Sequence, residues 1–279
     1  MHTGPYERYV ALGDSQTEGL GDGDDSTGLR GCADRLAELM AVGSPGLTYA
    51  NLAVRGRQAG QVRAEQLGPA LALRPDVATV VAGMNDLLRP RFDVDEVAGH
   101  LEAMFAELTA RGARVATVTF PDAGRIIPLA RPLGSRIVAL NTRIREAAAR
   151  HGVAVAETDR HPVVTDARLW SPDRLHASPL GHARIAAAVA DALGLPGSDD
   201  SWTHPLPAGP PPSGPRRALD EARWIAAFLG PWIGRRLRGR SSGDGRAAKR
   251  PDLMAVPVGT GEVRTASGRP SRPSPPASP

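Results

Sequence analysis

The fold is decided by the segment YVALGDSQTEG, residues 9–19, near the start of the chain. Its first four residues, 9–12, form a continuous apolar run, which is typical of a strand covered on both faces of a sheet. Polar residues follow at once, beginning with Gly13-Asp14-Ser15. Because open α/β sheets bind ligands beyond the carboxyl ends of their strands, these residues are the first candidates for a functional site.

The same alternation of elements continues along the chain. Four more apolar runs predict strands, and longer stretches with helical periodicity lie between them. The strands are expected at 9–12, 48–53, 77–82, 114–120 and 153–157, and the helices at 28–41, 60–73, 93–111, 131–150 and 179–193. Ser178 and Pro179 supply an N-cap and a first-turn proline for the last helix. This alternation indicates an α/β domain with a mostly parallel, five-stranded sheet and right-handed crossovers.

Charge and proline content divide the chain of 279 residues after residue 196. Residues 197–279 carry 13 Lys+Arg, 7 Asp+Glu and 14 of the 26 prolines, whereas residues 1–196 carry 21 Lys+Arg and 23 Asp+Glu. Such a basic, proline-rich segment cannot bury enough apolar surface to offset the entropy of ordering it. We therefore predict one folded domain over 6–194, a Pro-rich linker over 195–215 and a disordered tail over 241–279.

Residues 216–240 have an amphipathic and basic pattern. Apolar residues recur at helical spacing from Leu219 to Leu229, Trp224 adds a large apolar surface, and four arginines follow between 235 and 240. The preferred interpretation is a C-terminal helix that docks its aromatic face on the domain or on a partner chain. The alternative is a helix that lies on an anionic membrane surface. No nucleic-acid reader motif accompanies the charge, so no specific nucleic-acid binding is predicted.

The sequence argues against a membrane protein, a secreted protein and a metal site. No apolar run approaches the roughly 18 to 20 residues of a membrane span, and the N-terminus lacks the basic and apolar regions of a secretory signal, so we expect a cytoplasmic protein. The single cysteine, Cys32, is expected to be a small buried side chain. The acidic stretch 21–25 lacks the spacing of an EF-hand and is interpreted as a solvated loop. His100 and His182 are interpreted as surface or packing residues, and no metal or cofactor is predicted.

Polar segments at the ends of the predicted elements together supply the groups that acyl transfer needs. Ser15, directly after the first strand, is the candidate nucleophile, and His176, just before the last helix, is the candidate base. Asp173, three residues earlier, can accept the Nδ1–H of that imidazole. The predicted donors for the oxyanion are the N–H groups of Ser15 and Gly56 and the side-chain amide of Asn85, which follow the first, second and third strands.

These segments, in this order, resemble the SGNH (GDSL-type) hydrolase superfamily over about residues 6–194. Each segment alone is an ordinary turn sequence, and it is their combination that is specific. The resemblance implies a flavodoxin-like three-layer α/β/α fold, metal-independent hydrolysis of esters, and the roles given above to Ser15, Gly56, Asn85, Asp173 and His176. Two residues depart from the family's common pattern. Gln16 replaces an apolar residue after the serine, and Arg57 replaces a small or hydroxyl residue after the glycine.

We therefore expect a serine ester hydrolase that acts on a small-molecule ester without a cofactor. Because a protonated imidazole cannot accept a proton from Ser15, the rate should rise with pH between about 5 and 8. An acyl-thioesterase, or a lysophospholipase or lipase at a membrane surface, is the alternative within enzymes. A non-catalytic carbohydrate- or lipid-binding module is the alternative from another class.

The sequence does not assign the substrate-binding residues. Pocket walls in this fold come from loops, and here we expect residues 20–30, 57–60, 87–93 and 122–135 to provide them. Four arginines in or beside these loops are candidates for recognition of an anionic group, namely Arg89, Arg91, Arg125 and Arg131.

Overall fold

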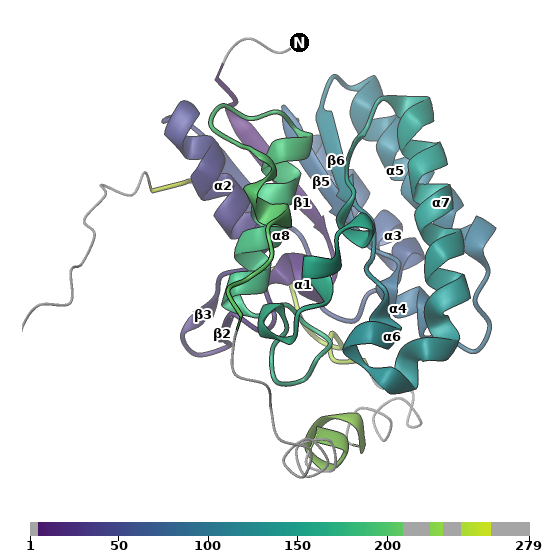
Figure 1. Ribbon diagram of the computed structural model, residues 1–279. Coiled ribbons are helices and arrows are strands. Elements are labelled where there is room, and N and C mark those ends of the chain that lie inside the picture. The colour runs from purple at the N-terminus through teal and green to yellow at the C-terminus, as the bar shows by residue number, and fades with distance from the viewer. Residues whose placement is uncertain (1–4, 209–223, 231–240, 258–279) are drawn as a thin grey trace, which may run out of the picture.

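The computed structural model describes residues 5–208, 224–230 and 241–257 (Figure 1). In these residues the main sheet has six strands in the order β7-β6-β5-β1-β4-β8. Five strands are parallel: β1 (Arg8–Gly13), β4 (Thr48–Asn51), β5 (Val77–Val81), β6 (Arg114–Val118) and β7 (Ala154–Ala156). Their order along the sheet is second, first, third, fourth, fifth, which is the flavodoxin-like order. The five predicted strands and the expected fold are confirmed.

Helices cover both faces of the sheet, which gives three layers (Figure 1). One face carries α2 (Cys32–Gly43) and α8 (Pro179–Ala192), and the other carries α3 (Ala59–Ala72), α5 (Val94–Ala110) and α7 (Gly134–His151). The five helices predicted within residues 28–193 are all present. Only α2 begins clearly later than expected, because β2 (Gly23–Asp24) and β3 (Gly28–Leu29) form a small hairpin before it. No helix within the described ranges is long and apolar enough to cross a membrane.

The apolar run in β1 is explained by these two helix layers. Val10 and Leu12 face the core under α3, α5 and α7, whereas Tyr9 and Ala11 face the core under α2 and α8. All four side chains are fully buried. Burial of a large apolar side chain stabilises a fold by about 1.5 to 3 kcal/mol, so a strand between two layers is apolar at every position rather than at alternate ones.

The predicted disordered tail over 241–279 is wrong for its first part, because residues 241–257 are ordered. They include β8 (Arg250–Ala255), which pairs antiparallel with the edge strand β4, with a bulge between the Tyr49 and Asn51 pairings. Pro251 and the flanking charges hide the strand in the sequence, but proline is tolerated in an edge strand or at a bulge. Residues 258–279 lie outside the described residues.

The predicted linker over 195–215 is also wrong for its first part. Leu195 and Trp202 are buried against α8, and the Trp202 Nε1–H donates a hydrogen bond to Asp191 at 3.0 Å. Burial of an indole orders this stretch in spite of its polar composition. Residues 209–215 lie outside the described residues, as does most of the helix predicted over 216–240. Of that helix the structure describes 224–230, which contains the π-helical turn η6 (Ile225–Leu229).

Candidate active site

All five predicted site residues line one cavity of about 420 Å³ at the carboxyl edge of the sheet. Ser15 begins the short helix α1 (Ser15–Glu18) directly after β1, and Asn85 lies on α4 (Met84–Leu87) after β5. Gly56 lies in the turn after β4, and Asp173 and His176 lie in the loop before α8. Strands β1 and β5 are the neighbours between which the strand order reverses, where this fold binds its ligands.

The side chains of Ser15, His176 and Asp173 form one hydrogen-bonded row. His176 Nε2 lies 2.9 Å from Ser15 Oγ, and His176 Nδ1 lies 2.6 Å from Asp173 Oδ2. With Nδ1–H donated to the carboxylate, Nε2 is free to accept the proton of the Ser15 hydroxyl. The three groups that the sequence predicts as nucleophile, base and orienting carboxylate therefore lie within hydrogen-bond distance of one another.

The carboxylate of Asp173 is itself held by its own loop. Its Oδ1 accepts hydrogen bonds from Ser171 Oγ at 2.6 Å, from the Leu175 N–H at 2.8 Å and from the His176 N–H at 3.0 Å. Burial alone would raise the pKa of Asp173, but the hydrogen bonds and charge of His176, with the bond from Ser171, hold it well below its usual value. Asp173 is therefore ionised at neutral pH, and its hydrogen bond with Nδ1 orients the imidazole.

A left-handed residue gives this loop its shape. Arg174, between Asp173 and Leu175, has φ of 59°, a backbone conformation that is unfavourable for a side chain with a Cβ. The Arg174 N–H donates to the Ser171 carbonyl at 2.9 Å, which closes a tight turn. The turn lets the Asp173 carboxylate reach both the backbone and the ring of His176. Such strained positions are concentrated at functional sites.

The backbone donors predicted for the oxyanion are available. Within the described ranges the N–H groups of Ser15 and Gly56 donate no hydrogen bond. Gly56 has φ of 77°, and a side chain at this position would collide with the hydroxyl of Ser241. Glycine is therefore favoured here by the backbone conformation, and it also leaves room for the two serine hydroxyls beside it.

The side-chain amide of Asn85 is held next to the Ser15 segment. Its Nδ2 lies 3.0 Å from Asp14 Oδ2 and 3.0 Å from the carbonyl oxygen of Arg57. These two bonds orient both N–H groups of the amide. Unlike the two backbone donors, this predicted oxyanion donor is therefore bonded to acceptors of the protein itself.

Asp14 is a site residue that the sequence analysis did not assign, although it is the middle residue of the Gly-Asp-Ser box. Its side chain is buried, and burial raises its pKa from 3.8 to about 7, even though hydrogen bonds from the Gln16 N–H and Asn85 and the charge of His176 favour the ionised form. The raised pKa arises only from the tertiary environment, so the sequence contained no direct signal for it.

The raised pKa predicts a pH-dependent stability difference between wild type and Asp14→Asn. A carboxyl group with a folded pKa above its unfolded pKa stabilises the fold when protonated, and this contribution is lost as pH rises through the folded pKa of about 7. Wild type should therefore lose about 2.5 kcal/mol relative to Asp14→Asn between about pH 5 and about pH 8. Urea unfolding at both pH values measures the difference, and a constant difference would contradict the assignment.

Gln16 lines the cavity and also contacts the loop of His176. Its Nε2 donates to the Leu175 carbonyl at 3.0 Å, and its Oε1 accepts from the Ala177 N–H at 3.2 Å. The side chain thus ties the segment that carries Ser15 to the backbone on both sides of His176. The departure from the family's apolar residue therefore adds a link between the segments that carry Ser15 and His176.

Replacement of Gln16 by leucine should lower kcat about 10- to 100-fold, because small displacements of a base relative to its nucleophile have effects of this size. The KM should change little, since the side chain bonds to the loop. Gln61→Leu is the matched control, because Gln61 also accepts a backbone hydrogen bond, at 3.0 Å from the Gln58 nitrogen, but away from His176. Equal kcat values for the two variants would show that the Gln16 link has no catalytic consequence.

His182 and Cys32 are packing residues beside the site. His182 is fully buried; its Nδ1 accepts the Cys32 N–H at 3.1 Å and its Nε2 lies 2.9 Å from the Leu20 carbonyl. Burial lowers the pKa of His182 to about 4 and raises that of the Cys32 thiol to about 12. The imidazole is therefore neutral and the thiol is not a nucleophile at neutral pH. In the part of the chain that the structure describes, no group of metal-ligating side chains is present.

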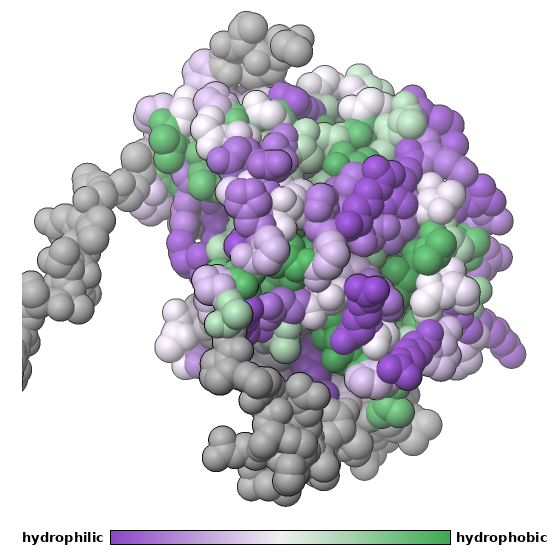
Figure 2. All heavy atoms as spheres, in the orientation of Figure 1, coloured by the Kyte–Doolittle hydropathy of each residue, from purple (hydrophilic) through white to green (hydrophobic). Residues whose placement is uncertain are grey.

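The cavity walls agree only partly with the predicted loops. Residues in the ranges 20–30, 87–93 and 122–135 line the cavity, but 57–60 do not, and Arg89 is the only one of the four candidate arginines that does. Apart from Asp173 and His176, the wall formed by residues within 158–185 was not predicted from the sequence, nor were Phe228, Ser241 and Ser242. Most lining side chains are apolar, among them Met84, Leu88, Phe120, Ile126 and Leu133. Figure 2 shows hydrophobic residues among hydrophilic ones on the lower half of the face seen in Figure 1.

A flavodoxin-like sheet with this row of side chains at its carboxyl edge defines a hydrolase of the SGNH class. The chain belongs to the GDSL-like lipase/acylhydrolase family, whose model matches residues 11–184. It is a hydrolase that acts on ester bonds. No curated protein matches the sequence significantly.

Solved structures show the same fold at low sequence identity. A lipase/acylhydrolase from Enterococcus faecalis is 23% identical, with a TM-score of 0.56 over 72% of this chain and 100% of that chain. A catalytic mutant of the acetylxylan esterase Axe2 from Geobacillus stearothermophilus is 19% identical, with a TM-score of 0.58 over 74% of this chain and 100% of that chain. The enzyme LAE5 from the Lake Arreo metagenome is 22% identical, with a TM-score of 0.56 over 67% of this chain and 95% of that chain.

Proposed function

We propose that this hydrolase is a serine esterase in which Ser15 is the nucleophile, His176 the general base and Asp173 the residue that orients it. The proposal rests on the hydrogen-bonded row, with 2.9 Å between Ser15 Oγ and His176 Nε2 and 2.6 Å between His176 Nδ1 and Asp173 Oδ2. Both distances are within the reach that proton transfer and its orientation require.

The reaction follows from this geometry in two halves. Ser15 Oγ attacks the ester carbonyl while His176 Nε2 takes the hydroxyl proton, and the carbonyl oxygen becomes an oxyanion. The N–H groups of Ser15 and Gly56 and the amide of Asn85 stabilise that charge, and each such donor contributes about 3 to 4 kcal/mol in well-studied hydrolases. His176 then returns the proton to the leaving alcohol, and a water molecule, activated by the same base, releases the acid from Ser15.

The composition of the cavity supports an apolar acyl group. Met84, Leu88 and Phe120 line it on the side of α4 and β6, together with Ile126 from α6 (Ala123–Ile126). Burial of a methylene group in such a wall contributes about 0.8 kcal/mol to binding, so short and medium acyl chains should be preferred over charged acids. We therefore propose small carboxylic esters as substrates.

A substrate panel combined with covalent labelling tests the proposal. The panel contains p-nitrophenyl acetate, butyrate and octanoate, an acyl thioester and a lysophospholipid in vesicles. Hydrolysis of the p-nitrophenyl esters, with stoichiometric labelling of the Ser15 peptide by a fluorophosphonate, is the expected result. Faster hydrolysis of the thioester or of the lysophospholipid would show that the substrate is not a small carboxylic ester. A folded protein that neither hydrolyses nor is labelled would instead be a binding module.

A further inference from the structure

The C-terminal arm, defined as residues 224–230 and 241–257, forms part of the cavity wall. Phe228, Ser241 and Ser242 line the cavity together with the candidate catalytic residues. The hydroxyls of Ser241 and Ser242 lie directly beside Gly56, because a Cβ at residue 56 would contact both. A segment about 65 residues beyond His176 in sequence therefore borders the oxyanion donors.

The first anchor of the arm is Trp224. Its side chain is buried, and its Nε1–H donates to the carbonyl oxygen of Asp173 at 2.9 Å. The guanidinium carbon of Arg174 lies 4.8 Å from the centroid of the Trp224 ring, within the range of a cation–π contact. The arm therefore contacts the turn that orients His176.

The second anchor joins the arm to the turn that carries Gly56. Gly243 packs so closely on the carbonyl of Arg55 that a side chain at residue 243 would collide with it. Arg55 forms a buried ion pair with Glu18 at 2.6 Å and a second pair with Asp25 at 2.8 Å. Arg246 of the arm pairs with the same Asp25 at 2.6 Å. Charges of alternating sign thus connect helix α1 to the arm.

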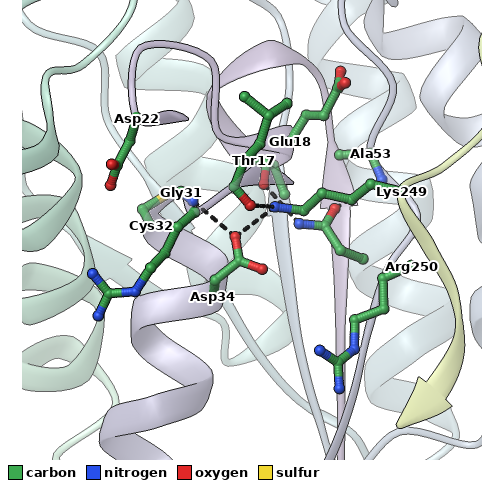
Figure 3. A network of polar contacts seen from close by, with 12 residues as sticks. Thr17, Glu18, Asp22, Gly31, Cys32, Asp34, Ala53, Lys249 and Arg250 are labelled. Atoms are coloured by element: carbon green, nitrogen blue, oxygen red, sulfur yellow. Dashed lines mark hydrogen bonds and ion pairs between the residues drawn. The ribbon is translucent and has the colours of Figure 1, made fainter. Parts of the chain in front are cut away.

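The third anchor is Lys249, directly before β8 (Figure 3). Lys249 Nζ lies 2.6 Å from Asp34 Oδ2 on α2 and donates to the Leu29 carbonyl at 2.9 Å. Both charged side chains are less than one-fifth exposed, at 19% and 17%, so solvent screens this pair less than a surface pair. The next residues form β8 on the edge of the sheet. Three separate anchors make the arm a fixed wall.

We propose that this wall limits the size of the alcohol group of the ester. The inference rests on the proposed function. When Ser15 Oγ is bonded to the carbonyl carbon, the oxyanion faces Gly56 and Asn85, and the alcohol oxygen faces His176, which must protonate it. Trp224 of the arm packs on the Asp173–Arg174 turn that orients His176, and Phe228 lines the cavity together with His176. The arm therefore borders the alcohol, and its Ser241 and Ser242 extend the same wall to Gly56, whereas the apolar wall at α4 and α6 borders the acyl group. Esters of compact alcohols should therefore be hydrolysed in preference to esters of bulky alcohols.

Two variants with opposite effects test the inference. Phe228→Ala widens the cavity, and Ser242→Trp narrows it. Ser242 is exposed, and its side chain makes no hydrogen bond in the described ranges. The ratio of kcat/KM for 2-naphthyl acetate to that for phenyl acetate should rise about tenfold in Phe228→Ala and fall about tenfold in Ser242→Trp. The ratio for p-nitrophenyl octanoate to p-nitrophenyl acetate should stay at its wild-type value in both.

Met254→Ala is the control within the arm, because Met254 is 57% exposed on β8 and does not line the cavity. It should leave both ratios unchanged. Folded variants that change the acyl ratio instead of the alcohol ratio, or change neither, would overturn the assignment of the arm to the alcohol side. A wild type that shows neither hydrolysis nor fluorophosphonate labelling would overturn the proposed function, so the two failures are distinguishable.

Discussion

Replacement of Ser15 by alanine should lower kcat by roughly five to six orders of magnitude, the loss found when the nucleophile of a serine hydrolase is removed. The alanine lacks the atom that forms the acyl bond, and the hydroxyl's 2.9 Å hydrogen bond to His176 is lost with it. Stopped assays with p-nitrophenyl butyrate, calibrated against active sites titrated with a fluorophosphonate, measure the change. Labelling should disappear in the same variant.

The control for this variant is Ser26→Ala. Ser26 is exposed, and its hydroxyl donates to Asp24 in the loop between β2 and β3. Its removal should leave kcat and labelling unchanged. The thermal midpoint of Ser15→Ala should stay close to that of wild type, because the hydroxyl makes a single side-chain hydrogen bond among the residues that the structure describes. A folded Ser15→Ala enzyme with more than about one hundredth of wild-type activity would exclude Ser15 as the nucleophile.

Replacement of Asp173 by asparagine should lower kcat about 10⁴-fold, because the amide would impose the wrong tautomer on His176. Asparagine can keep Oδ1 on Ser171 and on the Leu175 and His176 amides, which places its NH₂ group against His176 Nδ1. The ring would then carry its proton on Nε2, the atom that must accept the proton of Ser15. Steady-state kinetics between about pH 6 and pH 9 measure the loss.

The matched control is Asp95→Asn, which removes an exposed carboxylate paired with Arg143 at 2.8 Å, on a helix away from the cavity. Its kcat should equal that of wild type. Retention of wild-type kcat by a folded Asp173→Asn enzyme would mean that the carboxylate holds the loop together but does not set the tautomer of His176. A loss of folding in circular dichroism would show that the loop bonds need both carboxylate oxygens.

Local patterns in the sequence predicted the parallel strands, their helices and the five candidate site residues. The apolar run before Ser15 is readable because a strand between two helix layers must be apolar at every position. The site residues are readable because this fold places its ligands at the ends of strands, so Ser15, Gly56 and Asn85 occur directly after predicted strands. The hydrogen-bond distances that join them could not be derived from spacing alone.

Only the tertiary structure decided the roles of residues whose partners are distant in sequence. Burial decides the raised pKa of Asp14, and Gln16 reaches the loop of His176 only after both segments meet at the edge of the sheet. Residues 241–257 of the arm have the composition of a disordered tail, yet Lys249 pairs with Asp34, 215 positions away along the chain. Trp224, in the segment predicted as a helix, donates to Asp173, 51 positions away. Composition and periodicity describe a segment by its own residues, whereas the energy that orders this arm comes from surfaces that exist only when the domain is folded.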